Sequence, residues 1–251
     1  MNDLFSVKDK VIIVTGASKG IGKTVAEALV ESGAIVYGIG TSFENKSEGN
    51  FNQMKCDITN HEGFKKICDS IFNFDGRIDG MVNNAGVTYT GNENEPYPEY
   101  LWDKTMEINL KSVFKNTQYV CELMYKNGTG SVVNLTSLNA SFGFPNNPAY
   151  QASKGGLRML TKSFARDWGR KGLRFNNIVP GLMVTRLTQA SHDNPVTHTQ
   201  RRQNMMLGRW GQPEDIVGPC IFLLSNASSY MTGQDIYVDG GWSANGLPFL
   251  D

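Results

Sequence analysis

A tyrosine and a lysine at helical spacing are the residues of this sequence that could do chemistry together. Tyr150 and Lys154 lie four positions apart in residues 149–168, a stretch that we expect to be helical. Side chains with this spacing share one helix face, so the ammonium can act on the phenol. Tyrosine has an ordinary pKa of about 10, and a cation at ~4 Å in a medium of effective dielectric ~20 stabilises the phenolate by roughly 4 kcal/mol. The spacing therefore predicts a phenol whose pKa is lowered enough to exchange protons near neutrality.

A serine could complete this pair. Ser137 precedes the tyrosine by thirteen positions and follows an apolar run, residues 131–135. Its hydroxyl is neither acid nor base at working pH, but it can hold a carbonyl or alcohol oxygen beside the phenol. Taken alone, Tyr150 and Lys154 also fit an aromatic core residue and a solvated charge. The elements around them have to decide between these interpretations.

Length and composition narrow the class of protein. The 251 residues are enough for one large α/β domain or two small ones, and 24 basic residues balance 24 acidic ones. This balance gives no field that would attract nucleic acid or an anionic membrane, so we expect neither partner. Four scattered cysteines lack metal-ligand or redox-pair spacing, and we expect buried thiols in a reducing compartment, without a metal. No signal peptide or membrane span is recognisable, which predicts a cytoplasmic, soluble protein.

A glycine-rich turn near the beginning of the chain predicts a dinucleotide site. The apolar run Val11–Thr15 is typical of a strand buried on both faces, and a helical pattern follows up to Ser32, with Gly33 as a C-cap. Between them the glycines would let the backbone approach a pyrophosphate, at a helix N-terminus that offers unpaired N–H groups. The residues predicted to bind cofactor here are Gly16, Ser18, Lys19, Gly20, Ile21 and Gly22.

The end of the second expected strand, residues 34–39, indicates the cofactor's identity. NAD-binding folds place an acidic side chain there to hold the ribose 2′-hydroxyl, but the first acid in this chain is Glu44, which comes too late. Without that carboxylate a 2′-phosphate is not repelled, and Thr41, Ser42 and Lys19 could donate hydrogen bonds to it. The sequence therefore favours NADP(H) over NAD(H).

Two further segments are predicted to border the cofactor. A third strand, residues 52–56, ends at Asp57 and Ile58, where the carboxylate could accept from the adenine amino group. A fourth strand, residues 79–82, runs into Asn83 and then Asn84, Ala85 and Gly86. A turn at the carboxyl end of a central strand lies across the crevice from the first glycine turn in a doubly wound sheet. Asn83 itself needs no role beyond that of a structural turn.

The remaining pattern completes one domain, residues 1–251, without linker or repeat. Strands at 131–135, 174–179 and 234–238 bring the expected parallel sheet to seven strands with helices on both faces, a Rossmann-like α/β fold. Residues 99–126 predict one long helix, bent or straight, with Asn109 in an unfavourable central position. Gly155 and Gly156 interrupt the helix that carries the tyrosine, and we expect a helix of another subunit to approach there.

The segment 182–208 is polar, broken and too long for a simple connector, so we expect a lid or substrate loop. Two histidines and two arginines in it could meet a polar or anionic substrate, or could form a solvated loop face. These residues are His192, His198, Arg201 and Arg202.

Taken together and in order, these segments resemble the short-chain dehydrogenase/reductase family, from about Val11 to Trp242. The resemblance rests on the glycine turn, on Asn83–Gly86, on Asn109, on Ser137 with Tyr150 and Lys154, and on three later segments. Those segments are Pro180–Gly181, Arg209–Asp215 and Thr232–Gly241.

The resemblance implies roles for the residues. Ser137 would hold the substrate oxygen, Tyr150 would donate or accept its proton, and Lys154 would lower the pKa of Tyr150 while binding the nicotinamide ribose. Asn109 would anchor a water that links Lys154 to solvent. A hydride would pass between the nicotinamide and the substrate carbon. The family further implies nicotinamide contacts from Pro180, Gly181 and Thr185, and a homotetramer paired partly through the helix with the two glycines.

Three functions remain open at this stage. The turn at Thr41–Ser42 is similar to that of 3-oxoacyl-[acyl carrier protein] reductases, which dock an acidic carrier protein on basic residues. One such position here is the neutral Asn127 and another is Lys171, so carrier-protein binding is in doubt. A sugar, polyol or aldonate dehydrogenase is the alternative within the family. A non-catalytic nucleotide-binding scaffold is the alternative from another class, and the retention of Asn109, Ser137, Tyr150 and Lys154 together counts against it.

Overall fold

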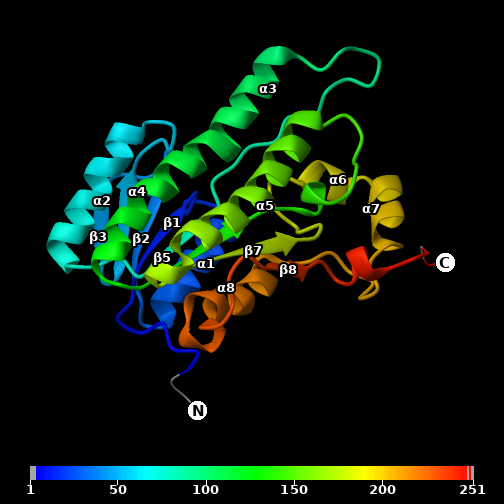
Figure 1. Ribbon diagram of the computed structural model, residues 1–251. Helices are drawn as coiled ribbons and strands as arrows, with labels where there is room; N and C mark the ends of the chain where they lie inside the picture. Colours follow the sequence, from blue (N-terminus) through cyan, green and yellow to red (C-terminus); the bar gives the residue numbers. More distant parts are fainter. Residues whose placement is uncertain (1–3, 248, 250–251) are drawn as a thin grey trace.

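The computed structural model describes residues 4–247 and 249, and its centre is a single eight-stranded sheet (Figure 1). The strands lie in the order β3-β4-β2-β1-β5-β6-β7-β8 and pair in parallel, except that β3 is antiparallel to β4. Their bounds are β1 Val11–Thr15, β2 Ile35–Gly40, β3 Lys46–Glu48, β4 Phe51–Lys55, β5 Gly80–Asn83, β6 Gly130–Leu135, β7 Leu173–Pro180 and β8 Asp235–Val238. The predicted α/β fold is confirmed, and β3 is a strand that the sequence pattern did not predict.

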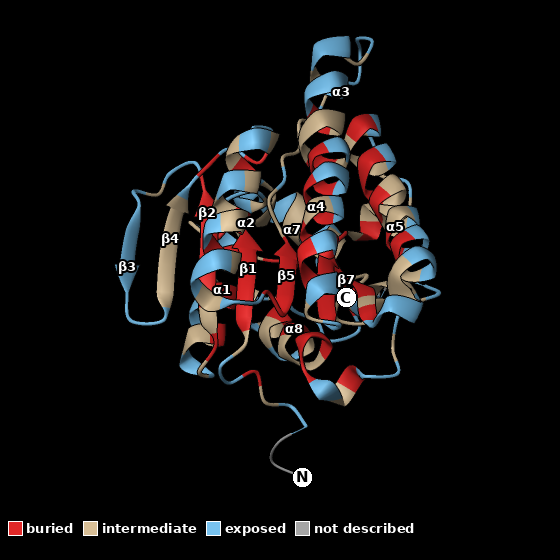
Figure 2. Cartoon of the chain, turned by 60° about the vertical axis from the view of Figure 1, so that its left-hand side comes forward, coloured by how far each residue is buried: buried red, intermediate tan, exposed pale blue. Residues whose placement is uncertain are grey.

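Helices cover both faces of this sheet and bury a separate apolar core on each. On one face lie α1 (Gly20–Glu31) and α8 (Val217–Leu224), and on the other α2 (His61–Asp75), α4 (Ser112–Lys126) and α5 (Pro148–Trp168). Alternate strand residues divide between the two cores. The central strands are buried between the helices (Figure 2). In β1, Ile13 packs with the α2 and α4 side, and Ile12 with the α1 and α8 side. Burial on both faces explains why these strands are almost continuously apolar.

The topology creates a crevice where the direction of strand order reverses. The chain passes from β1 outward through β2 to β4, and then returns to place β5 on the other side of β1. Ligands in open α/β sheets bind at the carboxyl ends of strands at such a switch point. Both predicted turns, residues 16–22 and 83–86, lie there because they follow β1 and β5.

The helix predicted at residues 99–126 consists of three parts. α3 (Glu99–Met106) and α4 are joined by a π-helical segment, Glu107–Lys111, with Asn109 at its centre. The carbonyl of Glu107 accepts from the Ser112 N–H and also from the Ser112 hydroxyl, at 2.7 Å in the latter case. Single π turns are rare and tend to occur at functional sites, so this interruption marks Asn109 more sharply than its helix propensity did.

The predicted lid contains two short helices, α6 (Gln189–Asp193) and α7 (Pro195–Arg202). Neither helix has a buried residue, and the segment is held at its base by a bridge between Met183 and Gly211. A 3₁₀ turn, Pro213–Ile216, precedes α8. All four cysteines are free and buried, as expected, and none of the helices within the described residues is long and apolar enough to cross a bilayer.

Candidate active site

The two turns at the switch point are joined by hydrogen bonds. The Thr15 hydroxyl accepts from the backbone N–H groups of Asn84 and Ala85, at 3.1 Å each, and donates to Val82 O. The Asn84 side-chain amide donates to Thr15 O at 3.0 Å and to Gly16 O at 3.2 Å. Asn84 therefore fixes the glycine turn on the neighbouring strand, a role that its predicted contact with cofactor did not include.

The glycines of the first turn serve two different needs. A Cβ on Gly22 would lie 2.2 Å from the Asn84 amide nitrogen and 2.4 Å from Gly16 O, so only glycine fits there. Gly20 has φ +56 and nothing within 4 Å of a Cβ position, so the turn is open on that side. The first turn of α1 has no side-chain cap at Lys19 and no acidic residue. Unpaired N–H groups facing open space fit a pyrophosphate.

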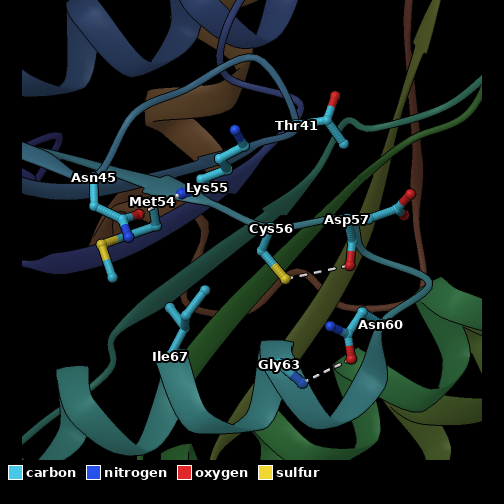
Figure 3. A pocket seen from close by; sticks show the side chains of 9 residues that line it. All are labelled: Thr41, Asn45, Met54, Lys55, Cys56, Asp57, Asn60, Gly63 and Ile67. Carbon is cyan, nitrogen blue, oxygen red and sulfur yellow. Dashed lines mark hydrogen bonds between the residues drawn. The ribbon is translucent and has the colours of Figure 1, made fainter.

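A cavity of about 430 Å³ lies beside this turn, at the carboxyl ends of β2 and β4 (Figure 3). Of the predicted cofactor residues, Thr41 and Asp57 line it, whereas Ser42 is an exposed neighbour and Ile58 is buried in an apolar core. One oxygen of the Asp57 carboxylate accepts from the Thr59 N–H and hydroxyl, both at 2.9 Å. Among the described residues, those that line it are Thr41, Asn45, Met54, Lys55, Cys56, Asp57, Asn60, Gly63 and Ile67.

Lys55 and Asn45 are members of this lining that the sequence pattern did not single out. The Asn45 side chain accepts from the Lys55 N–H at 2.8 Å and so holds the β3 hairpin against the end of β4. Glu44 is not among the residues that line the cavity. Asn45 and Lys55 come together through the pairing of β3 with β4, which the sequence pattern did not predict.

Ser137, Tyr150 and Lys154 are brought together by β6 and α5. Ser137 follows the end of β6, and Tyr150 and Lys154 lie in the first two turns of α5. The Ser137 hydroxyl donates to the Asn139 side-chain oxygen at 3.3 Å and accepts from the Asn139 N–H at 3.2 Å, and its interaction with the Tyr150 phenol lowers the pKa of that phenol. The Lys154 ammonium donates to Leu135 O at 2.6 Å and lies 5.7 Å from the centre of the Tyr150 ring. The predicted cluster therefore exists at the carboxyl edge of the sheet.

The protonation of this cluster differs from the prediction. Burial raises the pKa of Tyr150, and the Ser137 hydrogen bond lowers it by a smaller amount. Burial also lowers the pKa of Lys154 to about 8. The predicted net lowering of the Tyr150 pKa is wrong, because desolvation of the phenolate outweighs the favourable contacts and the ammonium is directed at Leu135 O.

Asn109 connects the π-helical segment to two other parts of the site. Its side chain accepts from Val87 N and donates to Val87 O, both at 2.8 Å, and donates to the Ser153 hydroxyl at 3.2 Å. A Cβ on Gly86 would lie 3.2 Å from the Asn109 oxygen and 3.8 Å from the Lys154 ammonium. Asn109 is thus close to Lys154, but its amide is engaged with protein groups, and its role as a water anchor stays a prediction.

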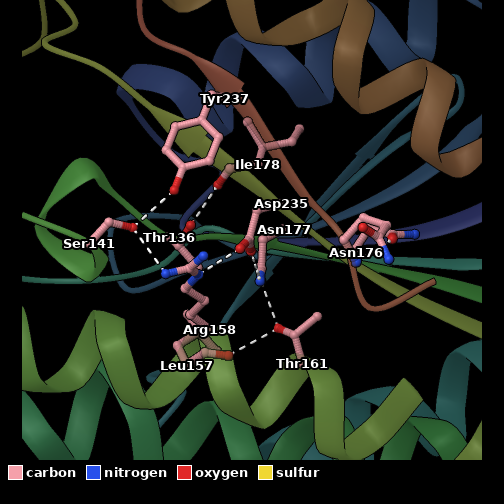
Figure 4. A network of polar contacts seen from close by, with 11 residues as sticks. Thr136, Ser141, Leu157, Arg158, Thr161, Asn176, Asn177, Ile178, Asp235 and Tyr237 are labelled. Atoms are coloured by element: carbon pink, nitrogen blue, oxygen red, sulfur yellow. Dashed lines mark hydrogen bonds and ion pairs between the residues drawn. The ribbon is translucent and has the colours of Figure 1, made fainter. Parts of the chain in front are cut away.

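A ladder of buried polar side chains fixes α5 on the sheet (Figure 4). Four residues in register, Asn83, Asn134, Asn177 and Asp235, cross β5 to β8. Thr161 of α5 donates to Asn177 at 2.6 Å and accepts from Asn134 at 2.8 Å. Asp235 pairs with Arg158 of α5 at 2.5 Å. Asn83 is therefore part of the support for the helix that carries Tyr150, rather than a turn residue alone.

The residues expected to contact nicotinamide lie at the end of β7. The Gly181 N–H donates to Val238 O at 2.9 Å, and a Cβ on Gly181 would lie 2.6 Å from the Asp239 Cα. Thr185 opens the lid, where its N–H donates to the Thr188 hydroxyl at 3.1 Å. Pro180, Gly181 and Thr185 border the carboxyl edge of the sheet on the side of Tyr150, and their contacts with cofactor stay predictions.

The two histidines of the segment 182–208 pack against each other and against Trp210. The rings of His192 and His198 are 4.9 Å apart, and both pack on Trp210, at 5.3 and 5.8 Å between centroids. The Arg201 guanidinium lies 5.9 Å from the Trp210 ring. Trp210 is 4 % exposed and its indole N–H has no partner among the described residues. The sequence analysis included Trp210 only within the segment Arg209–Asp215 and gave it no role, but in the structure it joins the two histidines in an aromatic cluster.

Comparison with known proteins places this geometry in context. A family model described as enoyl-(acyl carrier protein) reductase matches residues 16–243. A 2-dehydro-3-deoxy-D-gluconate 5-dehydrogenase of Bacillus subtilis is 37% identical over 252 residues, which covers 96% of this chain and 98% of the relative. A cyclopentanol dehydrogenase of Comamonas is 34% identical, covering 95% of this chain and 99% of the relative.

A solved structure extends this comparison. The gluconate 5-dehydrogenase of Burkholderia cenocepacia, in complex with NADP and tartrate, superposes with a TM-score of 0.88 at 30% identity. The match covers 96% of this chain and 98% of that one. The likeness therefore extends over the whole sheet and both turns.

Proposed function

This chain belongs to the short-chain dehydrogenase/reductase family, whose members act on CH–OH and C=O groups, and from this premise we propose that it interconverts a secondary alcohol and a ketone of a sugar acid with NADP(H). The observation that carries the proposal is the meeting of Ser137, Tyr150 and Lys154 beside the two turns of the switch point. The relatives named for aldonates support the substrate class.

The chain's own residues would supply binding and proton transfer. The Ser137 hydroxyl would hold the substrate oxygen, and Tyr150 would donate a proton to that oxygen in reduction or accept one in oxidation. Because its pKa is raised by burial, the phenol is a competent donor but needs nearby positive charge to act as a base. The nicotinamide, when bound, would accept or supply the hydride.

Lys154 would provide that charge at a cost. Its pKa of about 8 leaves most of the side chain protonated at neutral pH, and the ammonium is already held by Leu135 O next to the site. Asn109 would hold in place the residues next to Lys154, through its bonds to Val87 and Ser153 and its contact with Gly86. The four predicted catalytic residues thus have distinct tasks.

The glycine turn, the uncapped start of α1 and the cavity beside β4 would hold the cofactor. Thr41 and Lys55 line that cavity, and Asp57 is the one carboxylate among the described residues of its lining. We therefore favour NADP(H), a choice supported by the NADP complex of the relative from Burkholderia.

A homotetramer is proposed for the assembly, and an exposed groove on α4 and α5 supports contact between copies. Phe114 and Met159, 43% and 61% exposed, line this groove of about 610 Å³ together with Gly156. Gly156 is also needed within the chain, because a Cβ there would lie 2.8 Å from Leu110. Sedimentation of a monomer at all micromolar concentrations would contradict the proposed assembly.

A carrier-protein reductase is less well supported. Lys171, the basic position that remains, stacks on Trp168 at 4.1 Å, and Asn127 is neutral and ends α4. A turnover assay on gluconate, 2-dehydro-3-deoxygluconate, cyclopentanol and a 3-oxoacyl thioester separates the substrate classes. Preferred turnover of the thioester would overturn the sugar-acid assignment.

The substitution Tyr150→Phe tests the catalytic proposal against the scaffold alternative. Loss of the proton donor should lower kcat by about 10²–10⁴-fold, while nucleotide binding by calorimetry stays unchanged. Unchanged turnover in this variant would remove Tyr150 from the mechanism.

A further inference from the structure

The last residues of two neighbouring strands create an unusual opening at the nucleotide end of the site. Lys55 ends β4 and pairs in register with Gly40, which ends β2. Phe51, four residues earlier on β4, faces the side of the sheet that carries the glycine turn, because a Cβ on Gly38 would lie 2.8 Å from Phe51 and 3.0 Å from Ala17. Side chains alternate along a strand, so Lys55 faces the same side.

The glycine at position 40 leaves room for this lysine next to the turn. A Cβ on Gly40 would lie 3.3 Å from the Ser18 hydroxyl oxygen, so the end of β2 is in direct contact with the glycine turn. Figure 3 shows the Lys55 side chain extending away from Ile67 of α2, on the same side as Thr41. Lys55 therefore lies at the same end of the sheet as Thr41 and as Ser18, which is next to Gly40.

Its charge is available there. Within the described part of the chain, no carboxylate pairs with the Lys55 ammonium, and the ammonium donates no hydrogen bond. Lys46, on the same hairpin, is instead paired with Glu48 on the exposed edge strand. The backbone of Lys55 is held in place by Asn45. An unpaired cation on a fixed strand end, beside hydroxyl donors, fits a phosphate dianion.

We propose that Lys55 binds the 2′-phosphate of NADP(H) and sets the cofactor preference of this chain. The inference rests on the proposed function and adds a residue that neither the glycine turn nor the end of β2 contains. Thr41 lines the same cavity as Lys55, and Ser18 lies beside Gly40, the register partner of Lys55, so both hydroxyls would share the phosphate oxygens. The adjacent cavity accommodates the adenosine.

Calorimetry with two small nucleotides isolates this contact from turnover. Adenosine 2′,5′-bisphosphate and adenosine 5′-monophosphate are titrated into the wild type and into Lys55→Gln, Lys55→Arg and Lys46→Gln. Loss of one charge-assisted contact should weaken the bisphosphate by about tenfold in Lys55→Gln and leave the monophosphate unchanged. Lys55→Arg should retain the bisphosphate affinity, and Lys46→Gln should match the wild type. The NADPH to NADH ratio of kcat/KM should fall by the same factor in Lys55→Gln only.

Each other outcome has a distinct meaning. If Lys46→Gln and Lys55→Gln weaken bisphosphate binding equally, the cause is a general loss of positive charge. If Lys55→Gln leaves bisphosphate binding unchanged, Lys55 makes no contact with the phosphate. Either result overturns the inference, while the proposed NADP(H) preference stands. A wild type that binds both nucleotides equally and prefers NADH overturns the proposed preference together with the inference. Lys55→Gln is an exposed substitution, and an unchanged melting temperature without nucleotide confirms that its fold is intact.

Discussion

The two turns at the switch point and the segment 182–208, which we expect to be a lid, are built in opposite ways. The turns are bound to each other by Thr15 and Asn84, and Gly22 fills its space completely. The helices α6 and α7 of that segment have no buried residue, and the indole N–H of Trp210 has no partner within the part of the chain that the structure describes. A cofactor shared by many enzymes tolerates a rigid cradle, whereas a substrate region changes with the chemistry it must recognise.

The residues proposed to be catalytic are held as rigidly as the two turns. α5 is bound to β6, β7 and β8 through Thr161 and Arg158, and Asn109 links its Ser153 to Val87. Buried polar networks that are fully satisfied define one geometry, and the position of Tyr150 benefits from that. Substrate specificity is therefore expected to vary through the lid, with little change in the positions of Ser137, Tyr150 and Lys154.

The largest effect is expected from filling the tightest position in the turns. Gly22→Ala places a methyl group 2.2 Å from Asn84 and 2.4 Å from Gly16 O, and overpacking of this kind costs about 3 kcal/mol. Thermal unfolding measures the loss, and nucleotide binding should weaken with it. Gly218→Ala is the matched control, because a Cβ on this exposed helical glycine would have nothing within 4 Å. This variant should be more stable than the wild type by about 0.5–1 kcal/mol. Equal stability of the two variants would refute the rigid character of the turns.

An intermediate effect is expected at Lys154, and its sign depends on pH. The pKa is about 8 in the folded protein and 10.5 when unfolded, so the unfolded chain binds more protons between these values. Lys154 lowers the free energy of unfolding below pH 8, and this destabilisation becomes smaller as the pH rises toward 10.5. The free energy of unfolding of the wild type minus that of Lys154→Met should therefore increase over this interval, by about 2–3 kcal/mol. Denaturant titrations at pH 7.5 and 9.5 measure it, and a constant difference would contradict the buried, depressed lysine.

The smallest effect is expected in the lid. Asn194 caps α7 by accepting from Val196 N and Thr197 N, and its replacement by alanine should cost about 1 kcal/mol within that helix alone. Hydrogen exchange should accelerate in residues 195–202 without a change in global unfolding. Asn60→Ala removes the equivalent cap of α2, whose Phe64 and Ile71 lie in the core, and should lower global stability by about the same amount. A global loss in Asn194→Ala would mean that the lid folds together with the sheet.

Sequence patterns predicted most of the fold because its signals are local. Seven strands are present within one or two residues of the predicted positions, and α1 and α5 lie where helices were predicted. β3 was missed because Lys46–Glu48 is fully exposed and polar, and it is a strand only through its pairing with β4. The break in the helix at residues 107–111 was missed because a π turn depends on what packs around it.

The sequence by itself determined the strand–turn–helix order, the glycines of the first turn and the one-turn spacing of Tyr150 and Lys154, since these depend on neighbours along the chain. Only the tertiary structure decided that burial raises the pKa of Tyr150, that Asn109 is held by Val87 and Ser153, and that Lys55 lies beside Gly40. Desolvation and cross-strand pairing are set by residues far apart in the sequence, and no local pattern contains them.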